Sequence, residues 1–151
     1  MCKFENAQTF SGLRRTVIVG LFLFLCACKE NEKTGLQNFR DVTGEFGAGY
    51  YFSATKADLD KNIFLFVQDY DSTGFISLGN KLIKFKLIKG DYNDQTNDFS
   101  EVYAHGEYKI RINVKYMRDD TAYENYVGEM SLENKSGIMQ KERVVGYSLS
   151  E

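Results

Sequence analysis

The stretch Lys109-Ile110-Arg111-Ile112-Asn113-Val114-Lys115-Tyr116 decides the fold predicted for this chain of 151 residues. Apolar and polar side chains alternate along it without a break. A period of two residues is typical of a strand with one buried face. A helix would instead turn Ile110 and Val114 away from Ile112. The stretch therefore predicts a strand with Ile112 near the middle of its buried face and Asn113 facing solvent.

Segments on both sides of this strand carry further strand and turn patterns. Residues 82–88 and 126–132 alternate in the same way, and residues 138–149 are predicted to form a last strand. Gly79-Asn80 separates two apolar stretches and is a two-residue hairpin signal. Residues 134–137 form a further turn signal that ends in glycine.

The N-terminal half of the domain is less regular. Residues 44–52 are rich in glycine and aromatic residues and are expected to form the first strand. The continuous apolar run over residues 63–67 is typical of a more buried strand. Residues 54–61 are the best helical segment, with Thr55 as a candidate cap before Asp58.

Seven or eight short strands separated by turn residues predict a mainly β protein, a single small antiparallel β-sandwich or barrel. The most polar stretch, residues 91–98, is predicted to form a surface loop, which is either a solvated hairpin connection or a binding loop. The net charge is −2 and no basic run is present. Nucleic acid is therefore not expected as a partner, and no phosphate loop or dinucleotide fingerprint appears.

A second segment, residues 14–28, decides where the protein is expected to reside. Arg14 and Arg15 precede an apolar run over residues 17–25, and the segment closes with Cys26, Ala27 and Cys28. A basic start, a short apolar run and small residues before a cut are the parts of a secretory signal. A membrane-spanning helix would need about 20 apolar residues, which is more than this run holds.

The ending Leu25-Cys26-Ala27-Cys28 resembles the lipobox of bacterial lipoproteins. The resemblance implies cleavage by signal peptidase II before Cys28, a diacylglycerol thioether on its sulfur and usually a further acyl chain, such as palmitate, on its amine. It implies a signal peptide over residues 1–27, a lipidated cysteine with a tether over 28–41, and a β-rich domain over 42–151. An uncleaved anchor and a core strand are the alternatives for the apolar run.

The implied location is the cell envelope, with the outer membrane of a Gram-negative bacterium favoured and its periplasmic and surface faces both open. Translation is expected to start at Leu13, directly before Arg14, which would leave residues 1–12 untranslated; Met1 is the other candidate start. The three cysteines are Cys2, Cys26 and Cys28. The mature domain would therefore hold neither a disulfide pair nor a thiol nucleophile.

The stretch from Asp69 to Gly74 resembles the beginning of an EF-hand calcium loop. Asp69, Asp71 and Thr73 would supply oxygen ligands, and Gly74 would permit the sharp turn. The twelfth position is Asn80, where a bidentate glutamate is expected, and the flanking residues resemble strands. Aspartate-rich turns between strands are common without a metal. A plain hairpin turn is therefore predicted, with calcium as the competing hypothesis and no other cofactor expected.

His105 is the only histidine in the chain. A serine hydrolase would need it as the base, but no Gly-x-Ser-x-Gly elbow supplies the nucleophile. A zinc site would have to combine this imidazole with carboxylates alone. Because Gly106 follows, His105 is predicted to be a turn residue.

These features favour a lipid-anchored cell-envelope protein that is not an enzyme and that binds another protein or a small ligand. One version is an immunity lipoprotein that neutralises a toxin. The alternatives are an envelope hydrolase that uses His105 with carboxylates, and a calcium-binding β domain that uses residues 69–74. The lipid on Cys28 would provide the contact with the membrane.

Replacement of Cys28 by serine tests the lipid anchor. Cys28→Ser removes the sulfur that accepts the lipid, so the precursor should stay uncut and should not incorporate labelled palmitate. Gel electrophoresis of labelled cells measures both effects. The matched variant Cys26→Ser keeps a small residue before the cut and should mature normally. Normal maturation and full labelling of Cys28→Ser would exclude the lipobox.

Overall fold

The computed structural model describes residues 35–41, 46–118 and 124–150. The predicted signal peptide, the start of translation and Cys28 therefore lie outside the described residues. Within these ranges the chain is mainly β and forms a closed antiparallel barrel of eight strands. This confirms the predicted fold class and selects the barrel over the sandwich.

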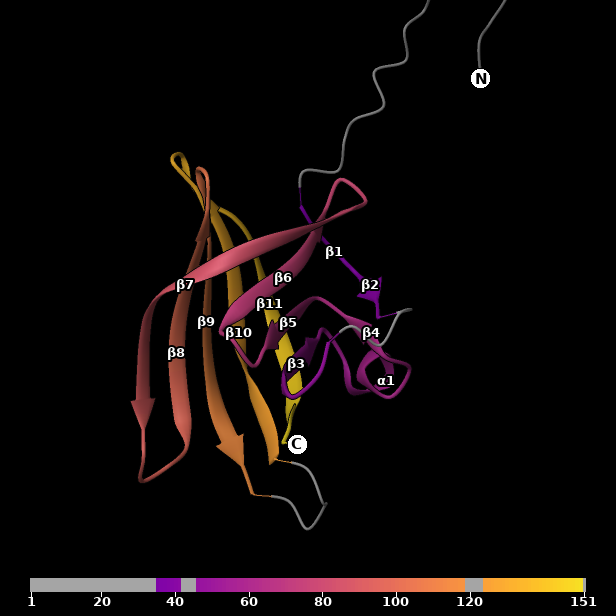
Figure 1. Ribbon diagram of the computed structural model, residues 1–151, viewed down its shortest axis with the longest axis vertical. Coiled ribbons are helices and arrows are strands. Elements are labelled where there is room, and N and C mark those ends of the chain that lie inside the picture. The colour runs from indigo at the N-terminus through magenta and orange to yellow at the C-terminus, as the bar shows by residue number, and fades with distance from the viewer. Residues whose placement is uncertain (1–34, 42–45, 119–123, 151) are drawn as a thin grey trace, which may run out of the picture. The chain divides into compact units, whose positions relative to one another are not determined.

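The order of the barrel strands along the chain is also their order around the barrel (Figure 1). They are β3 (Gly49–Ser53), β5 (Phe66–Asp69), β6 (Thr73–Leu78), β7 (Lys81–Asn93), β8 (Asp98–His105), β9 (Tyr108–Met117), β10 (Glu124–Asn134) and β11 (Gly137–Leu149). Each strand pairs antiparallel with the next, and β11 pairs with β3 to close the ring. The architecture is thus an up-and-down barrel.

Strand β9 is the strand that the alternating stretch predicts. Ile110, Ile112 and Val114 are buried, and the residues between them are exposed. Ile112 lies opposite Met130 of β10 and opposite Glu101 of β8. Residues directly opposite one another in antiparallel strands point to the same face, so β9 fixes the inward rows of both neighbours.

The interior of the barrel is filled by side chains. An eight-stranded barrel is just wide enough for side chains to fill it or to hold one small ligand. Every barrel strand sends a buried apolar side chain inward, from Phe52, Phe66, Ile76, Phe85, Tyr103, Ile112, Met130 and Val144. The rings pack edge to face, with the centroids of Phe66 and Tyr103 5.0 Å apart. The interior is therefore the hydrophobic core.

A second apolar cluster covers part of the outside of the barrel. Between β3 and β5 the chain leaves the barrel wall to form α1 (Lys56–Leu59) and β4 (Ile63–Phe64), and β4 pairs with β2 (Phe39–Arg40). The buried members of this cluster are Tyr51, Leu59, Phe64 and Val67. The outer faces of β3 and β5 are thereby covered, whereas the outer faces of β9 and β10 carry exposed polar residues such as Asn113 and Glu129.

Two local signals of the sequence are confirmed. Thr55 caps α1, because its Oγ1 accepts a hydrogen bond from the backbone N–H of Asp58 at 3.1 Å. Gly79 and Asn80 connect β6 and β7 with φ angles of 56° and 60°. Positive φ at both central residues defines the type I′ turn, whose twist matches that of the paired strands.

The structure divides the apolar run over residues 63–67 between two strands. It is not one strand, because β4 ends at Phe64 and β5 begins at Phe66. Leu65 between them donates its backbone N–H to the carbonyl of Phe52 at 2.8 Å. An apolar run shows burial but not the sheet to which each residue belongs.

Two polar segments also hold more regular structure than predicted. Residues 91–93 extend β7 and Asp98 begins β8, so the connection is shortened to residues 94–97. Residues 36–37, assigned by sequence to the tether, form β1 (Leu36–Gln37), which pairs with the end of β6. Leu36 is buried in the barrel core, so these residues belong to the domain.

Substitutions at Ile112 and Asn113 test the buried face of β9. Ile112 is fully buried, so Ile112→Asp should unfold the domain or nearly so, because an unpaired buried charge costs several kcal/mol against a typical stability of about 5–15 kcal/mol. Asn113 is exposed, so Asn113→Lys should change the free energy of unfolding by less than about 0.5 kcal/mol. Urea melts measure both. Equal tolerance at the two adjacent positions would contradict the register.

Candidate binding site on the outer face of the barrel

A groove with a volume of about 1130 Å³ crosses the outer face of β8, β9, β10 and β11. Strand register aligns its outward side chains in two rows. The first row is Ser100, Asn113, Glu129 and Arg143, and the second is Lys115, Val127 and Val145. Residues 91–95 of the hairpin between β7 and β8 also line it. We call this surface the outer groove.

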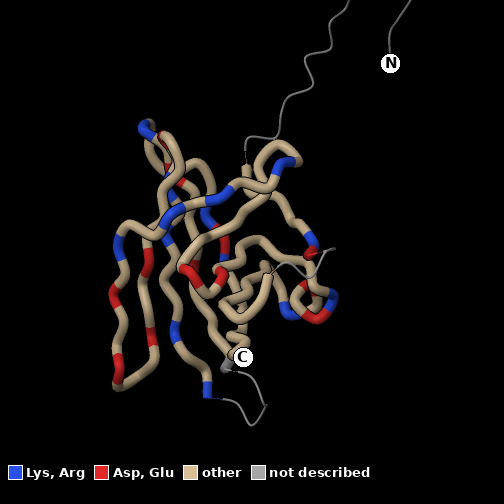
Figure 2. The backbone as a smooth tube through the Cα atoms, in the orientation of Figure 1, with Lys and Arg blue, Asp and Glu red and all other residues tan. Residues whose placement is uncertain are grey.

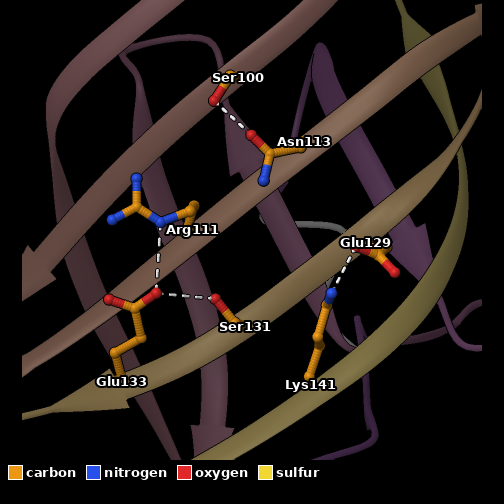
Figure 3. Close-up of polar contacts among 7 residues, drawn as sticks. All are labelled: Ser100, Arg111, Asn113, Glu129, Ser131, Glu133 and Lys141. Atoms are coloured by element: carbon orange, nitrogen blue, oxygen red, sulfur yellow. Dashed lines mark hydrogen bonds and ion pairs between the residues drawn. The ribbon is translucent and has the colours of Figure 1, made fainter. Parts of the chain in front are cut away.

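Some polar side chains on this face are already paired with one another (Figure 3). Ser100 Oγ donates a hydrogen bond to Asn113 Oδ1 at 2.5 Å within the groove. Beside it, Glu133 Oε1 accepts from Arg111 Nε at 3.3 Å and from Ser131 Oγ at 3.1 Å. These contacts orient neighbouring side chains across β8, β9 and β10.

The charges inside the groove are only partly paired. Glu129 forms an ion pair with Lys141 at 2.7 Å (Figure 3). Lys115 and Arg143 form no ion pair within the described residues, and both are exposed. Val127 lies between them with 37% of its surface exposed. The groove therefore offers two available cations on either side of an apolar position.

The hairpin between β7 and β8 adds acidic charge to the same groove. Asp91 and Asp94 line it, and neither forms an ion pair in the part of the chain that the structure describes. Figure 2 shows acidic positions along this hairpin, beside the basic positions of β9. The groove is thus dipolar, with cations over β9 and β11 and anions on the hairpin.

One carboxylate points into the barrel instead of outward. Glu101 lies opposite the fully buried Ile112, and Tyr103 donates a hydrogen bond from its hydroxyl to Glu101 Oε2 at 2.6 Å. Gln68 also forms a side-chain hydrogen bond with Glu101. The Oε1 atom of Gln68 is buried without a partner among the described residues. A buried acceptor without a donor costs about 1–3 kcal/mol.

Burial raises the pKa of Glu101 above its ordinary value, because desolvation disfavours the ionised carboxylate. The hydrogen bonds from Tyr103 and Gln68 act in the opposite direction and are smaller influences. Burial also raises the pKa of Tyr103, so its hydroxyl keeps the proton that it donates to Glu101. The barrel core therefore contains one polar cluster that responds to pH.

The structure brings the predicted calcium ligands together in the turn between β5 and β6. Asp69 Oδ1 accepts from the N–H of Asp71 at 2.7 Å, and Asp71 Oδ1 accepts from the N–H of Thr73 at 3.0 Å. Both carboxylates therefore cap the backbone of their own turn. Asn80 lies beyond β6, about 20 Å along the strand. Among the described residues no group of three or more His, Cys, Asp or Glu could hold a metal ion.

His105 is the exposed last residue of β8, next to the turn at Gly106. Its ring lies 5.5 Å from the ring centroid of Phe85. Its imidazole forms no hydrogen bond or ion pair within residues 35–41, 46–118 and 124–150. The described contacts therefore place no carboxylate in position to orient the imidazole, which a hydrolase of the triad type requires.

The fold and the outer groove define a small up-and-down β-barrel with a polar groove on its wall. Comparisons with known protein families, with curated proteins and with solved structures found no match to this chain. No helix in the described part of the chain is long and apolar enough to cross a membrane.

Sequence reasoning found the turn residues but missed the groove and the inward carboxylate. The groove depends on the register that places Lys115 beside Val127, and Glu101 is inward only because it lies opposite Ile112. The alternation of β9 shows which of its own side chains point inward. Extending this assignment to β8 and β10 requires knowing which residues lie opposite one another across the strands, and the sequence of one strand does not show this.

Replacement of Glu101 by glutamine tests the polar cluster in the core. A carboxyl whose pKa is raised by folding stabilises the protein fully below its ordinary pKa, and this stability is lost as the pH rises through the raised value. The wild type should therefore melt at a higher temperature just below the ordinary pKa of a carboxyl group than at neutral pH. Glu101→Gln should raise the melting temperature at pH 7 and flatten this dependence, since its amide can also donate to Gln68.

Thermal melts at several pH values measure this effect. The variant Glu107→Gln, on the exposed turn between β8 and β9, controls for the change in net charge. A wild-type dependence that Glu101→Gln leaves unchanged would assign the pH effect to other groups.

Proposed function

We propose that this protein is a non-catalytic binding protein of the bacterial cell envelope, held at a membrane by lipid on Cys28. The lipobox and the basic, apolar segment before it support the anchor. Cys28 lies outside the described residues, so this part of the proposal rests on the sequence. The outer membrane is the favoured location, on its periplasmic or surface face.

The outer groove is the observation that carries the proposed binding function. Because aromatic and aliphatic side chains fill the barrel, its wall provides the available surface. Small-molecule sites usually enclose most of their ligand, whereas Val127 on the groove floor is still 37% exposed. An open groove across four strands better suits a macromolecular partner than a small ligand.

The charges of the groove indicate the chemistry of this partner. Lys115 and Arg143 would face carboxylates, Asp91 and Asp94 would face basic side chains, and Val127 would contact an apolar side chain. Complementary charges of this kind set the register and the association rate of a protein complex. We therefore assign the groove to a protein that lays a segment of mixed charge across β8 to β11.

An immunity lipoprotein is one specific version of this function. Its partner would be a toxin that arrives in the envelope, and the groove would hold a charged segment of that toxin. The presence of a toxin gene beside the gene for this protein would support this version. Protection of cells from that toxin by the wild type, and not by a groove variant, would test it.

A double charge reversal tests the groove. Lys115→Glu combined with Arg143→Glu should weaken binding of the partner at least about tenfold, because two attractive contacts become repulsive. The partner is first identified by photo-crosslinking in cells from Val127, with Ala57 on α1 as the matched position. The affinity of the purified pair is then measured by calorimetry.

The control is the charge reversal Lys56→Glu with Lys61→Glu, which changes the net charge equally in and just after α1, outside the residues that line the groove. It should leave the affinity unchanged. Equal crosslinking from Val127 and Ala57, or equal affinity for both double variants, would show that the groove is not the binding surface.

A further inference from the structure

The chain enters the described domain at one end of the barrel. Strand β1 pairs with the last residues of β6, and Gln37 Oε1 accepts a hydrogen bond from the N–H of Asn80 at 2.8 Å. The N–H of Leu36 donates to Gln140 Oε1 of β11 at 2.8 Å. In an up-and-down barrel, alternate turns share one end, so the β6–β7, β8–β9 and β10–β11 turns lie together here (Figure 1). We call this the turn end.

Large apolar side chains at the turn end are exposed to solvent. Ile138, which follows the β10–β11 turn, has 65% of its surface exposed, and Met139 has 37%. Leu82, which follows the β6–β7 turn, has 47% exposed. Single exposed apolar residues are ordinary on protein surfaces, but these flank turns on the same end of the barrel.

Lysines surround these apolar side chains at the turn end. Lys81, Lys109 and Lys135 lie in or beside the three turns and are exposed. None of them forms an ion pair within the described residues. Glu107 contributes an acidic charge to the β8–β9 turn, so the three turns together still carry a net positive charge. Exposed apolar residues beside lysines are the composition of surfaces that bind anionic lipid.

The chain between the lipid and the barrel is short. Gly35 is the seventh residue after Cys28, and seven residues can span at most about 25 Å. Strand β11 has 13 residues, which corresponds to about 40 Å along the strand. The tether is therefore shorter than the longest strands of the barrel, and the first described strand, β1, lies at the turn end.

We infer that the turn end docks on the headgroups of the bilayer that holds the lipid of Cys28. Lys81, Lys109 and Lys135 contact anionic headgroups, and the side chains of Leu82 and Ile138 enter the interface between headgroups and acyl chains. The inference rests on the proposed lipid anchor. It places the hairpin of residues 94–97, and with it the acidic part of the outer groove, on the side away from the membrane.

Fluorescence of single cysteine labels on the mature lipoprotein tests this docking. After lipidation of Cys28 no free thiol remains in the mature chain, so Ile138→Cys or Gln95→Cys provides a unique labelling site. The protein is reconstituted through its acyl chains into vesicles of phosphatidylcholine with one-third phosphatidylglycerol. An environment-sensitive dye at residue 138 should shift to shorter wavelength and be quenched by spin-labelled lipid, whereas the dye at residue 95 should not.

The second measurement is the dependence of the quenching at residue 138 on the charges of the protein and of the lipid. Three lysines near an anionic leaflet favour the docked state by about a hundredfold, so Lys81→Glu, Lys109→Glu and Lys135→Glu together should abolish the quenching at residue 138. The matched variant Lys61→Glu, Lys115→Glu and Arg118→Glu changes the net charge equally away from the turn end and should retain it. Pure phosphatidylcholine vesicles should show weaker quenching for the wild type.

Failure of the lipid anchor and failure of the docking would give different results. Protein that does not float with the vesicles would refute the lipid anchor itself. Protein that floats but shows equal quenching at residues 138 and 95, or quenching that the turn-end reversal leaves unchanged, would refute the docking and leave the anchor intact.

Discussion

The pairing of β11 with β3 is the interaction on which the rest of the structure depends. Gly146 lies opposite Phe52 in this pair, and a β-carbon at Gly146 would collide with the Phe52 ring and with the backbone carbonyl of Tyr51. The absence of a side chain lets Phe52 lie across the seam, where it contacts Phe66, Phe99 and Tyr126. One small residue in the last strand thus allows the barrel to close over its aromatic core.

Closure also determines which surfaces remain for recognition. A ring of strands has no exposed edge, and buried side chains fill the interior of this ring. What remains is the outer wall, of which α1, β2 and β4 cover one side. The uncovered side bears the outer groove, where Lys115 and Arg143 are available and Glu129 is paired. Recognition by charge pattern is the binding mode that we propose for this wall.

The sequence predicted those parts of the fold that depend on local chemistry. The alternation of β9, the Gly79-Asn80 turn and the Thr55 cap each follow from a few adjacent residues and are confirmed. The division of residues 63–67 between two strands was not predictable, because all five residues are apolar and only the tertiary partner separates them. The choice between sandwich and barrel was likewise open, since it depends on Gly146 meeting Phe52 across nearly the whole domain.

In the candidate site, too, only the features that depend on adjacent residues could be predicted from the sequence. The turn of Asp69 and Asp71 and the position of His105 beside a turn could be recognised from neighbouring residues. The inward orientation of Glu101 could not, because alternation in β8 is irregular: Val102 and Tyr103 are adjacent and both buried. Only the register with Ile112 shows that this carboxylate is on the core side. Sites assembled across strands require the pairing before they can be identified.

The seam between the first and last barrel strands has a consequence for biogenesis. Contacts between residues distant in sequence form slowly, because the loop must close before they contribute. Here the ring is incomplete until β11 has left the ribosome, and the aromatic residues of β3 lack their full set of neighbours until then. The barrel core therefore cannot be completed before the last strand of the domain has been synthesised. If the chain is exported as we propose, this late closure would leave the domain unfolded during transport and would reserve folding for the far side of the membrane.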